Sequence, residues 1–146
     1  MKKTLAVVIV ALVFSLPLSS IAGHVYFTGD TWVGVYKFDV PTGERDRWDS
    51  ARQDTPPLPP GKALRVAKEF ARDVPLPKGW LRWVPEPGGV VMYCVSTSGA
   101  PEEWIYVIRF YAIPEGQPRN PPYPEINIPV RMDGSIPEPV VTKKAS

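Results

Sequence analysis

Side chains able to do covalent or metal chemistry are few in this sequence of 146 residues. It holds one histidine, His24, and one cysteine, Cys94. A Ser-His-Asp or Cys-His arrangement needs a histidine beside the nucleophile, and His24 falls directly after a predicted signal peptide. Structural zinc sites use four Cys or His ligands, more than the chain contains. The sequence therefore predicts no catalytic triad, no metal site and no cofactor.

Carboxylate pairs offer a second possible chemistry. Glu102-Glu103 and the Asp46/Asp49 group are the candidates. Glycoside hydrolysis requires two carboxyl groups held across a cleft at a defined separation, whereas these lie in turn-like segments expected to be solvated. Phosphate-binding and dinucleotide-binding motifs are missing as well. We expect a protein that is not an enzyme.

Aromatic and arginine side chains are the remaining candidates for function. A single short helix can cover only one face of the predicted sheet, so the other face needs a cover. Exposed aromatic and arginine side chains are typical of interfaces. The N-terminal hairpin, through Tyr36 and Phe38, a second copy of the chain or a ligand could supply this cover. The expected ligand is a protein of the cell envelope, and the alternative is a carbohydrate or small apolar ligand. The predicted interaction face consists of Trp80, Arg82, Trp83, Arg109 and Tyr111.

The stretch from Trp104 to Ile113 must position part of this face. It is rich in β-branched and aromatic residues and precedes Pro114, which predicts a long strand. Alternation places Tyr106, Ile108 and Phe110 on one side and Arg109 and Tyr111 on the other. Since both sides are otherwise apolar, the strand is expected to lie in the middle of its sheet.

One helix is predicted, over Lys62 to Val74. Alanines at 63, 67 and 71 form a small-residue stripe that permits close packing on a sheet, and Pro75 ends the pattern. Strands are expected at 80–84, 90–96, 126–131 and 136–141. Residues 85–89 (PEPGG) predict a chain reversal, and Asp133-Gly134 predicts a hairpin turn.

These elements predict a domain organisation and a fold class. Residues 23–48 form an N-terminal β-hairpin, with strands at 31–40 and 45–48, and residues 49–61 a proline-rich linker. Residues 62–141 form the main domain, and residues 142–146 a flexible tail. The expected fold is α+β, with one helix packed on an antiparallel sheet of four to five strands in two layers.

Residues 1–22 have the features of a secretory signal peptide. Lys2 and Lys3 precede an apolar run from Leu5 to Leu16, and Ser20-Ile21-Ala22 is a small-x-small cleavage site. The run is shorter than the about 20 residues that span a bilayer. Removing residues 1–22 leaves 124 residues with 15 basic and 15 acidic side chains. We therefore expect a periplasmic or extracellular protein with no stable membrane span and no nucleic-acid partner. Cys94 is expected to be a buried strand residue, and the alternative is an intermolecular disulfide or a reactive thiol.

Three segments together resemble a PepSY-like module. They are the helix at 63–71 (ALRVAKEFA), the strand at 104–110 (WIYVIRF) and the hairpin at 128–136 (IPVRMDGSI). The family pairs an alanine-containing helix with a strand of this type and a terminal hairpin containing Asp-Gly. The resemblance covers about residues 60–141. It implies an extracytoplasmic interaction module, sometimes linked to protease inhibition, and it identifies no functional residue.

Overall fold

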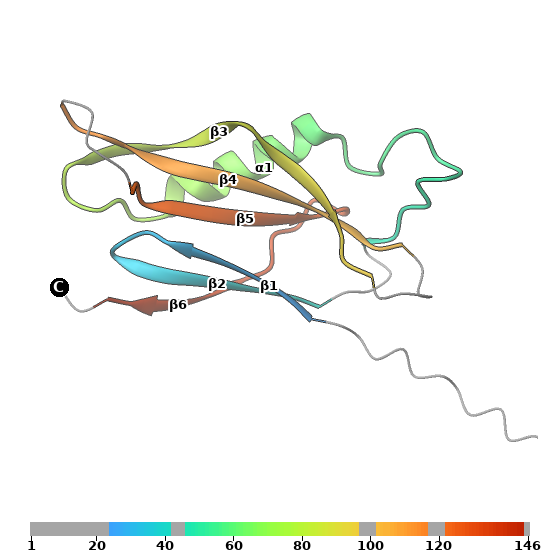
Figure 1. Cartoon of the computed structure of the whole chain (residues 1–146), viewed down its shortest axis with the longest axis horizontal. Coiled ribbons are helices and arrows are strands. Elements are labelled where there is room, and N and C mark those ends of the chain that lie inside the picture. Colours follow the sequence, from blue (N-terminus) through green and yellow to red (C-terminus); the bar gives the residue numbers. More distant parts are fainter. Residues whose placement is uncertain (1–23, 42–45, 97–101, 117–121, 145–146) are drawn as a thin grey trace, which may run out of the picture.

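The computed structural model describes residues 24–41, 46–96, 102–116 and 122–144. Two three-stranded antiparallel sheets and one helix make up the described chain (Figure 1). No helix in these residues is long or apolar enough to cross a membrane. The elements in chain order are β1 (His24–Asp30), β2 (Gly34–Pro41), α1 (Pro60–Asp73), β3 (Trp80–Cys94), β4 (Trp104–Pro114), β5 (Glu125–Arg131) and β6 (Pro139–Lys143).

Helix α1 confirms the predicted helix and its buried stripe. Pro60 occupies the first turn, where backbone N–H groups have no acceptor within the helix, so the missing N–H of proline costs no hydrogen bond. The helix ends at Asp73, before Pro75. Ala63, Ala67 and Ala71 are its buried residues. Because their side chains are small, the helix packs closely on the sheet formed by β3, β4 and β5 (Figure 1).

Strand β4 is the middle strand of the sheet β3-β4-β5, as the sequence predicts. Tyr106, Ile108 and Phe110 share the core with the alanines of α1. Arg109 and Tyr111 project from the opposite face of the same strand, opposite Asn127 and Glu125 of β5. The helix thus covers one face of this sheet.

The predicted chain reversal at residues 85–89 is wrong, because these residues lie within strand β3. The chain does not turn back there but continues along β4, so the two predicted strands form one strand of 15 residues. The pairing shifts between Pro85 and Val90, and Gly88 adopts a positive φ of 73°. Proline and glycine occur in bulges as well as in turns, and here they form a bulge in an edge strand.

The second sheet, β1-β2-β6, shows that the expected fold class is wrong. We expected one sheet of four to five strands, but the chain forms two sheets of three strands each. The N-terminal hairpin consists of β1 and β2, and β2 also pairs with the C-terminal β6. The predicted return strand at 45–48 is reduced to an isolated bridge between Arg47 and Glu103.

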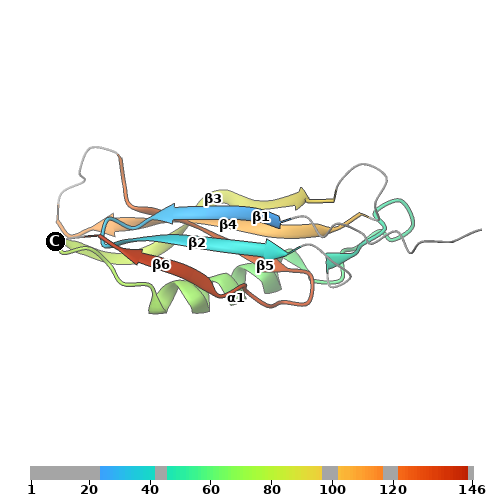
Figure 2. The ribbon, with the colours of Figure 1, turned by 90° about the horizontal axis from the view of Figure 1, so that it is seen from below.

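The position of β6 has a physical reason. The turn after β5 forms, with Arg131 N–H donating to Ser135 O at 2.9 Å. Pro137 and Pro139 then lack the N–H groups that a return strand beside β5 would need. Strand β1 instead contacts β5, and a Cβ atom on Gly29 would lie 2.6 Å from Ile126 Cα. Figure 2 shows β1, β2 and β6 lying over the other sheet.

The core is shared between the two sheets and the helix. Phe38 of β2 is fully buried, and its ring centroid lies 5.7 Å from that of Phe70 in α1. A smaller cluster of Val40, Ile105 and Val107 packs β2 against the face of β4 that the helix does not cover, so the N-terminal hairpin covers part of that face. The N-terminal hairpin is therefore part of the core of the protein.

A buried ion pair connects the segment after β2 to the end of β5. The Asp46 side chain is fully buried, and its Oδ2 lies 2.6 Å from Arg131 Nη2. Arg131 Nη2 also donates to Pro41 O at 2.8 Å, and Arg131 Nε donates to Asp46 Oδ1 at 3.3 Å. Two parallel bonds between a guanidinium and a carboxylate fix the relative position of the two segments.

The Tyr106 hydroxyl supplies a testable contact between the sheet and the segment before α1. This ring is almost fully buried, and its hydroxyl donates to Leu58 O at 2.7 Å. We expect Tyr106→Phe to lower the free energy of unfolding by about 1 kcal/mol, since it removes one buried hydrogen bond with little change in volume. Urea denaturation measures this change. Exposed Tyr93→Phe serves as control, and equal effects of the two changes would contradict the prediction.

Candidate functional site

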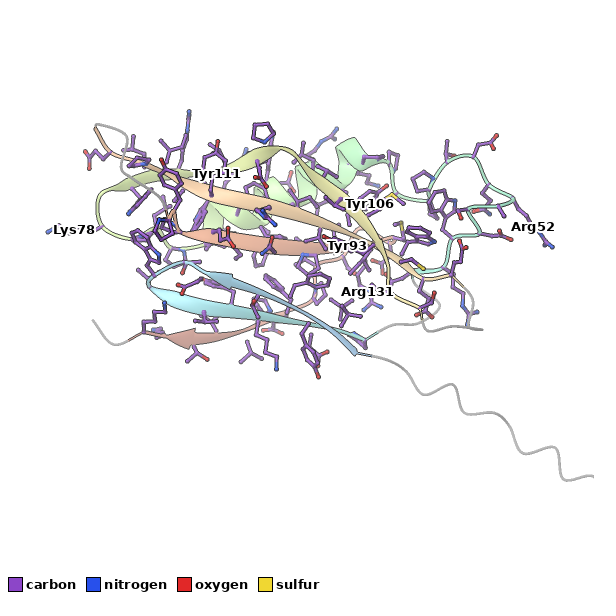
Figure 3. The ribbon with its side chains drawn as sticks, in the orientation of Figure 1. Arg52, Lys78, Tyr93, Tyr106, Tyr111 and Arg131 are labelled. Carbon is purple, nitrogen blue, oxygen red and sulfur yellow. The ribbon has the colours of Figure 1, made fainter. Side chains whose placement is uncertain are left out.

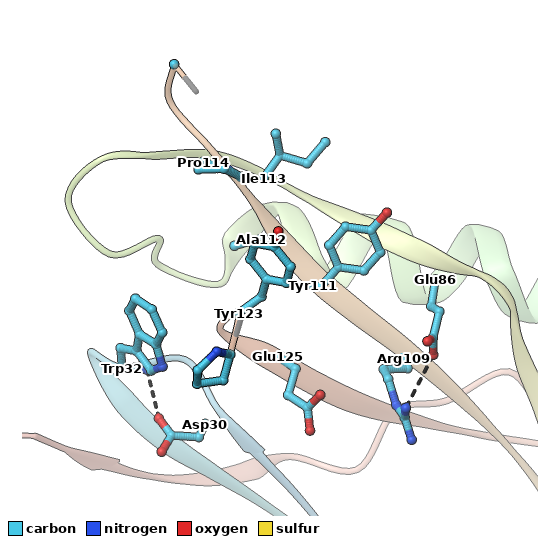
Figure 4. A pocket seen from close by; sticks show the side chains of 12 residues that line it. Asp30, Trp32, Glu86, Arg109, Tyr111, Ala112, Ile113, Pro114, Tyr123 and Glu125 are labelled. Atoms are coloured by element: carbon cyan, nitrogen blue, oxygen red, sulfur yellow. Dashed lines mark hydrogen bonds and ion pairs between the residues drawn. The ribbon is translucent and has the colours of Figure 1, made fainter. Parts of the chain in front are cut away.

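An open groove lies on the face of sheet β3-β4-β5 that the helix leaves uncovered. It has a volume of ≈930 Å³. Tyr111 and Ile113 of β4, Tyr123 before β5, and Trp32 between β1 and β2 are among the residues that line it (Figure 4). We call this feature the aromatic groove. Its size is near the upper end of the range of about 300–1,000 Å³ for ligand sites.

Four aromatic rings form a continuous series along the aromatic groove. Trp32 contacts Trp80 edge to face at 5.3 Å between ring centroids, and Trp80 contacts Tyr123 in the same way at 5.9 Å. Tyr123 in turn lies 6.3 Å from Tyr111. These edge-to-face and tilted geometries are favourable for aromatic pairs. The rings, which belong to four separate parts of the chain, therefore support one another.

The backbone at Trp32 is held in an unusual conformation. Its φ of 67° makes it the one described non-glycine residue with positive φ. The buried Thr31 hydroxyl donates to Gly34 O at 2.8 Å, and Trp32 N–H donates to the Asp30 carboxylate at 2.9 Å. Such a conformation costs about 1–3 kcal/mol, and strained residues of this kind are concentrated at functional sites. The turn presents a Trp32 side chain that stays 42% exposed.

Three carboxylates and one guanidinium line the aromatic groove. Arg109 Nη1 lies 3.4 Å from Glu86 Oε2, and Arg109 Nε donates to Asn127 Oδ1 at 3.3 Å. Asp30 pairs with Lys144 at 2.6 Å. Within the described residues, Glu125 has neither a hydrogen bond nor an ion pair through its side chain. Among the described residues that line the groove, the three carboxylates therefore outnumber the one arginine.

Asp30 allows a test of the electrostatics at the groove rim. Hydrogen bonds from Lys144 and then from the Trp32 N–H lower the pKa of Asp30 below its usual 3.8. A lowered pKa stabilises the fold above the usual pKa, and this contribution is lost as pH falls through the folded-state value. We expect Lys144→Ala to raise the pKa of Asp30 toward 3.8, measured by NMR titration of the carboxyl carbon. An unchanged titration would contradict the assigned contact.

A second hollow of ≈350 Å³ continues along the same face. Arg109 and Glu86 line both hollows, so their ion pair lies at the boundary between them. Val91 and Tyr93 of β3 line the second hollow and are 43% and 47% exposed. Figure 3 shows Tyr111 and Tyr93 at different points along the sheet. Together the two hollows form an elongated surface with an ion pair near its middle.

The predicted interaction face is divided by the fold. Arg109 and Tyr111 line the aromatic groove, and Trp80 is buried behind its wall. Arg82 and Trp83 line a separate hollow of ≈350 Å³ near the end of α1. There Trp83 Nε1–H donates to Val74 O at 3.0 Å, which fixes its ring on the helix side.

Glu125, Tyr123 and Trp32 are among the groove residues that were not identified from the sequence. Glu125 lies opposite Tyr111 across β4 and β5, and Tyr123 precedes that strand. Trp32 lies in a turn, and the signal that could have located it is the stretch Gly29-Asp30-Thr31-Trp32-Val33-Gly34 between two alternating runs. Sequence alternation along β4 could not place these residues because they belong to other segments.

Metal or thiol chemistry would depend on the possible metal ligands and on the one cysteine in the described part of the chain. No group of three His, Cys, Asp or Glu side chains is placed there to hold a metal ion. Cys94 is exposed at the end of edge strand β3, so the expectation that it is buried is wrong. The reason is its position beyond the part of the sheet that the helix covers. The side chain of His24 lies outside the described part of the structure.

Comparisons of this chain with protein-family models, with curated proteins and with solved structures give no match. Function is therefore inferred from the residues of the groove.

Proposed function

We propose that the protein is an exported, non-catalytic module that binds a segment of another protein along the uncovered face of sheet β3-β4-β5. The observation that carries this proposal is the continuity of the aromatic groove with the second hollow through Arg109 and Glu86. A surface of this shape fits an extended chain, because successive side chains can enter successive hollows.

The residue types of the surface also support a protein partner. Trp, Tyr and Arg are the side chains that contribute most often to binding energy at protein interfaces. Trp32, Tyr111 and Arg109 supply these three types on one face. Tyr93 and Val91 extend the exposed apolar area beyond the ion pair. The rings are held by their neighbours, which reduces the conformational entropy lost on binding.

A carbohydrate is the second candidate ligand. Three aromatic rings and several carboxylates line the same open groove, and carboxylates accept hydrogen bonds from hydroxyl groups. The Val91 and Tyr93 hollow has no role in that alternative. A small wholly apolar ligand fits less well, because the groove is open and holds four charged side chains.

Affinity capture from an envelope extract tests the proposal. The bait is the chain from residue 23 onward, compared with a Trp32→Ala, Tyr111→Ala double variant. We expect the double variant to lose the proteins that the unaltered chain recovers. The control is an Arg65→Ala, Glu69→Ala double variant on the exposed side of α1. Equal recovery by the groove variant would contradict the proposal, and selective binding to a glycan array through Trp32 and Tyr111 would favour the carbohydrate.

A further inference from the structure

We infer that the Trp32 end of the aromatic groove binds a cationic side chain, arginine or lysine, of the partner segment. This inference rests on the function proposed above and adds the chemical class of the ligand. Aromatic faces attract cations through the ring quadrupole, and a carboxylate beside the ring adds a charge-assisted hydrogen bond. Both kinds of group line the aromatic groove.

The charge distribution determines where the cation binds. Arg109 is matched by Glu86 at one end of the groove, and Asp30 is matched by Lys144 at the rim. Glu125 lies between these two pairs (Figure 4). Its carboxylate is therefore the one left to accept a ligand cation within the described lining of the groove.

The aromatic contacts of the cation come from Trp32 and Tyr123. Both side chains line the groove, and Figure 4 shows the Tyr123 ring beside Tyr111, with Trp32 and Glu125 lower in the view. Trp80 packs edge to face against each ring from behind, at 5.3 Å from Trp32 and 5.9 Å from Tyr123. The two rings are thereby fixed in position before a ligand arrives. Indole is the side chain with the strongest cation–π attraction, which favours the Trp32 side of the site.

The size of the groove favours a cation carried by a polypeptide. A volume of ≈930 Å³ far exceeds one cationic head group, and the surface continues past Arg109 to Val91 and Tyr93. A segment with one basic residue at the Trp32 end and apolar residues beyond it would fill both hollows. Such a segment would also neutralise the unmatched charge of Glu125.

Selection of short random peptides displayed on phage, with the chain from residue 23 onward as target, tests both levels of the proposal. We expect the selection to yield peptides that no longer bind when Tyr111 is replaced by alanine. Among these peptides, we expect arginine or lysine to be enriched at one position of the peptide sequence. The enrichment should disappear when the target is Glu125→Gln, which keeps the size of the side chain. Glu69→Gln on α1 is the matched control. Circular dichroism and thermal melts confirm that each variant is folded.

Each outcome of the selection has a defined meaning. Peptides that depend on Tyr111 but show no basic preference would overturn this inference and leave the proposed function in place. A selection without any Tyr111-dependent peptide would overturn both. For a selected arginine peptide, replacing arginine by neutral citrulline should weaken binding about tenfold, the effect of losing one partly desolvated cation–π contact. Equal binding of the citrulline peptide would also overturn the inference.

The same chemistry would serve a choline head group of a lipid. Vesicles of phosphatidylcholine are therefore included as a competitor of the arginine peptide. No competition by the vesicles supports a protein ligand. Binding of the vesicles that is lost in Trp32→Ala and Glu125→Gln would replace the partner protein by a lipid surface.

Discussion

Replacing Asp46 by alanine is expected to lower the free energy of unfolding by about 3–5 kcal/mol, because it leaves Arg131 as an unpaired buried charge. Asp46 is fully buried, and its carboxylate accepts hydrogen bonds from Arg131 and from the Met132 N–H. Urea denaturation of the chain from residue 23 onward measures the change. A loss of this size is a large fraction of the stability of an ordinary domain.

A double replacement separates the contribution of the ion pair to the free energy of unfolding from the contribution of packing. Arg131→Met alone should be strongly destabilising, since it leaves the Asp46 carboxylate buried without its guanidinium. The combination of Arg131→Met with Asp46→Leu removes both charges and should recover part of the loss. Exposed Asp49, which pairs with Arg52 on the surface, provides the control. Equal effects of Asp46→Ala and Asp49→Ala would contradict the assignment.

Replacing Gly29 by alanine is expected to cost about 3 kcal/mol or more, at the upper end of the range for overpacked sites. A Cβ atom at this position would lie 2.6 Å from Ile126 Cα and 2.9 Å from Ile126 Cβ. Because the first of these atoms is backbone, one strand would have to move away from the other. Thermal unfolding of the variant measures the effect on the contact between β1 and β5.

Gly61 offers a matched control for this substitution. It lies in α1, and nothing is within 4 Å of a Cβ atom added there. Gly61→Ala should therefore stabilise the protein by up to about 1 kcal/mol through the higher helix propensity of alanine. If Gly29→Ala were tolerated as well as Gly61→Ala, the two sheets could not be packed as closely at this point as the structure shows.

Local patterns predicted the elements that depend on nearby residues. The alanine stripe and Pro75 located α1, and the alternation of apolar residues identified β4 as the central strand. These signals were sufficient because side-chain periodicity and proline geometry act over a few residues. Arg109 and Tyr111 were placed on the uncovered face for the same reason.

Pairing between distant segments was the part that sequence could not provide. The bulge at residues 85–89 and a chain reversal share the same proline and glycine signals, so β3 was expected as two strands. Strand β6 pairs with β2 across most of the chain, a choice that depends on which edge remains available. Division of the strands into two sheets follows from these two features together.

The residues of the candidate site were also only partly predictable, because they come from distant segments of the chain. Tyr111 could be assigned from its own strand, but Trp32, Tyr123 and Glu125 reach the groove only through tertiary packing. Trp83 was expected on the same face, as one of the aromatic residues of the predicted sheet. Its pairing with Ala112, on the buried side of β4, and the hydrogen bond to Val74 place it on the helix side instead.

Site-specific photo-crosslinking tests the central claim that the uncovered face of sheet β3-β4-β5 binds a partner segment. Benzoylphenylalanine replaces Tyr111 in one variant of the protein. In a second variant it replaces Arg65, on the exposed side of α1. Mass spectrometry then locates the crosslinked residues on the captured protein. We expect position 111 to crosslink to one short contiguous segment of an envelope protein and position 65 to give no such product. Crosslinks to the same protein from position 65, with none from position 111, would contradict the account.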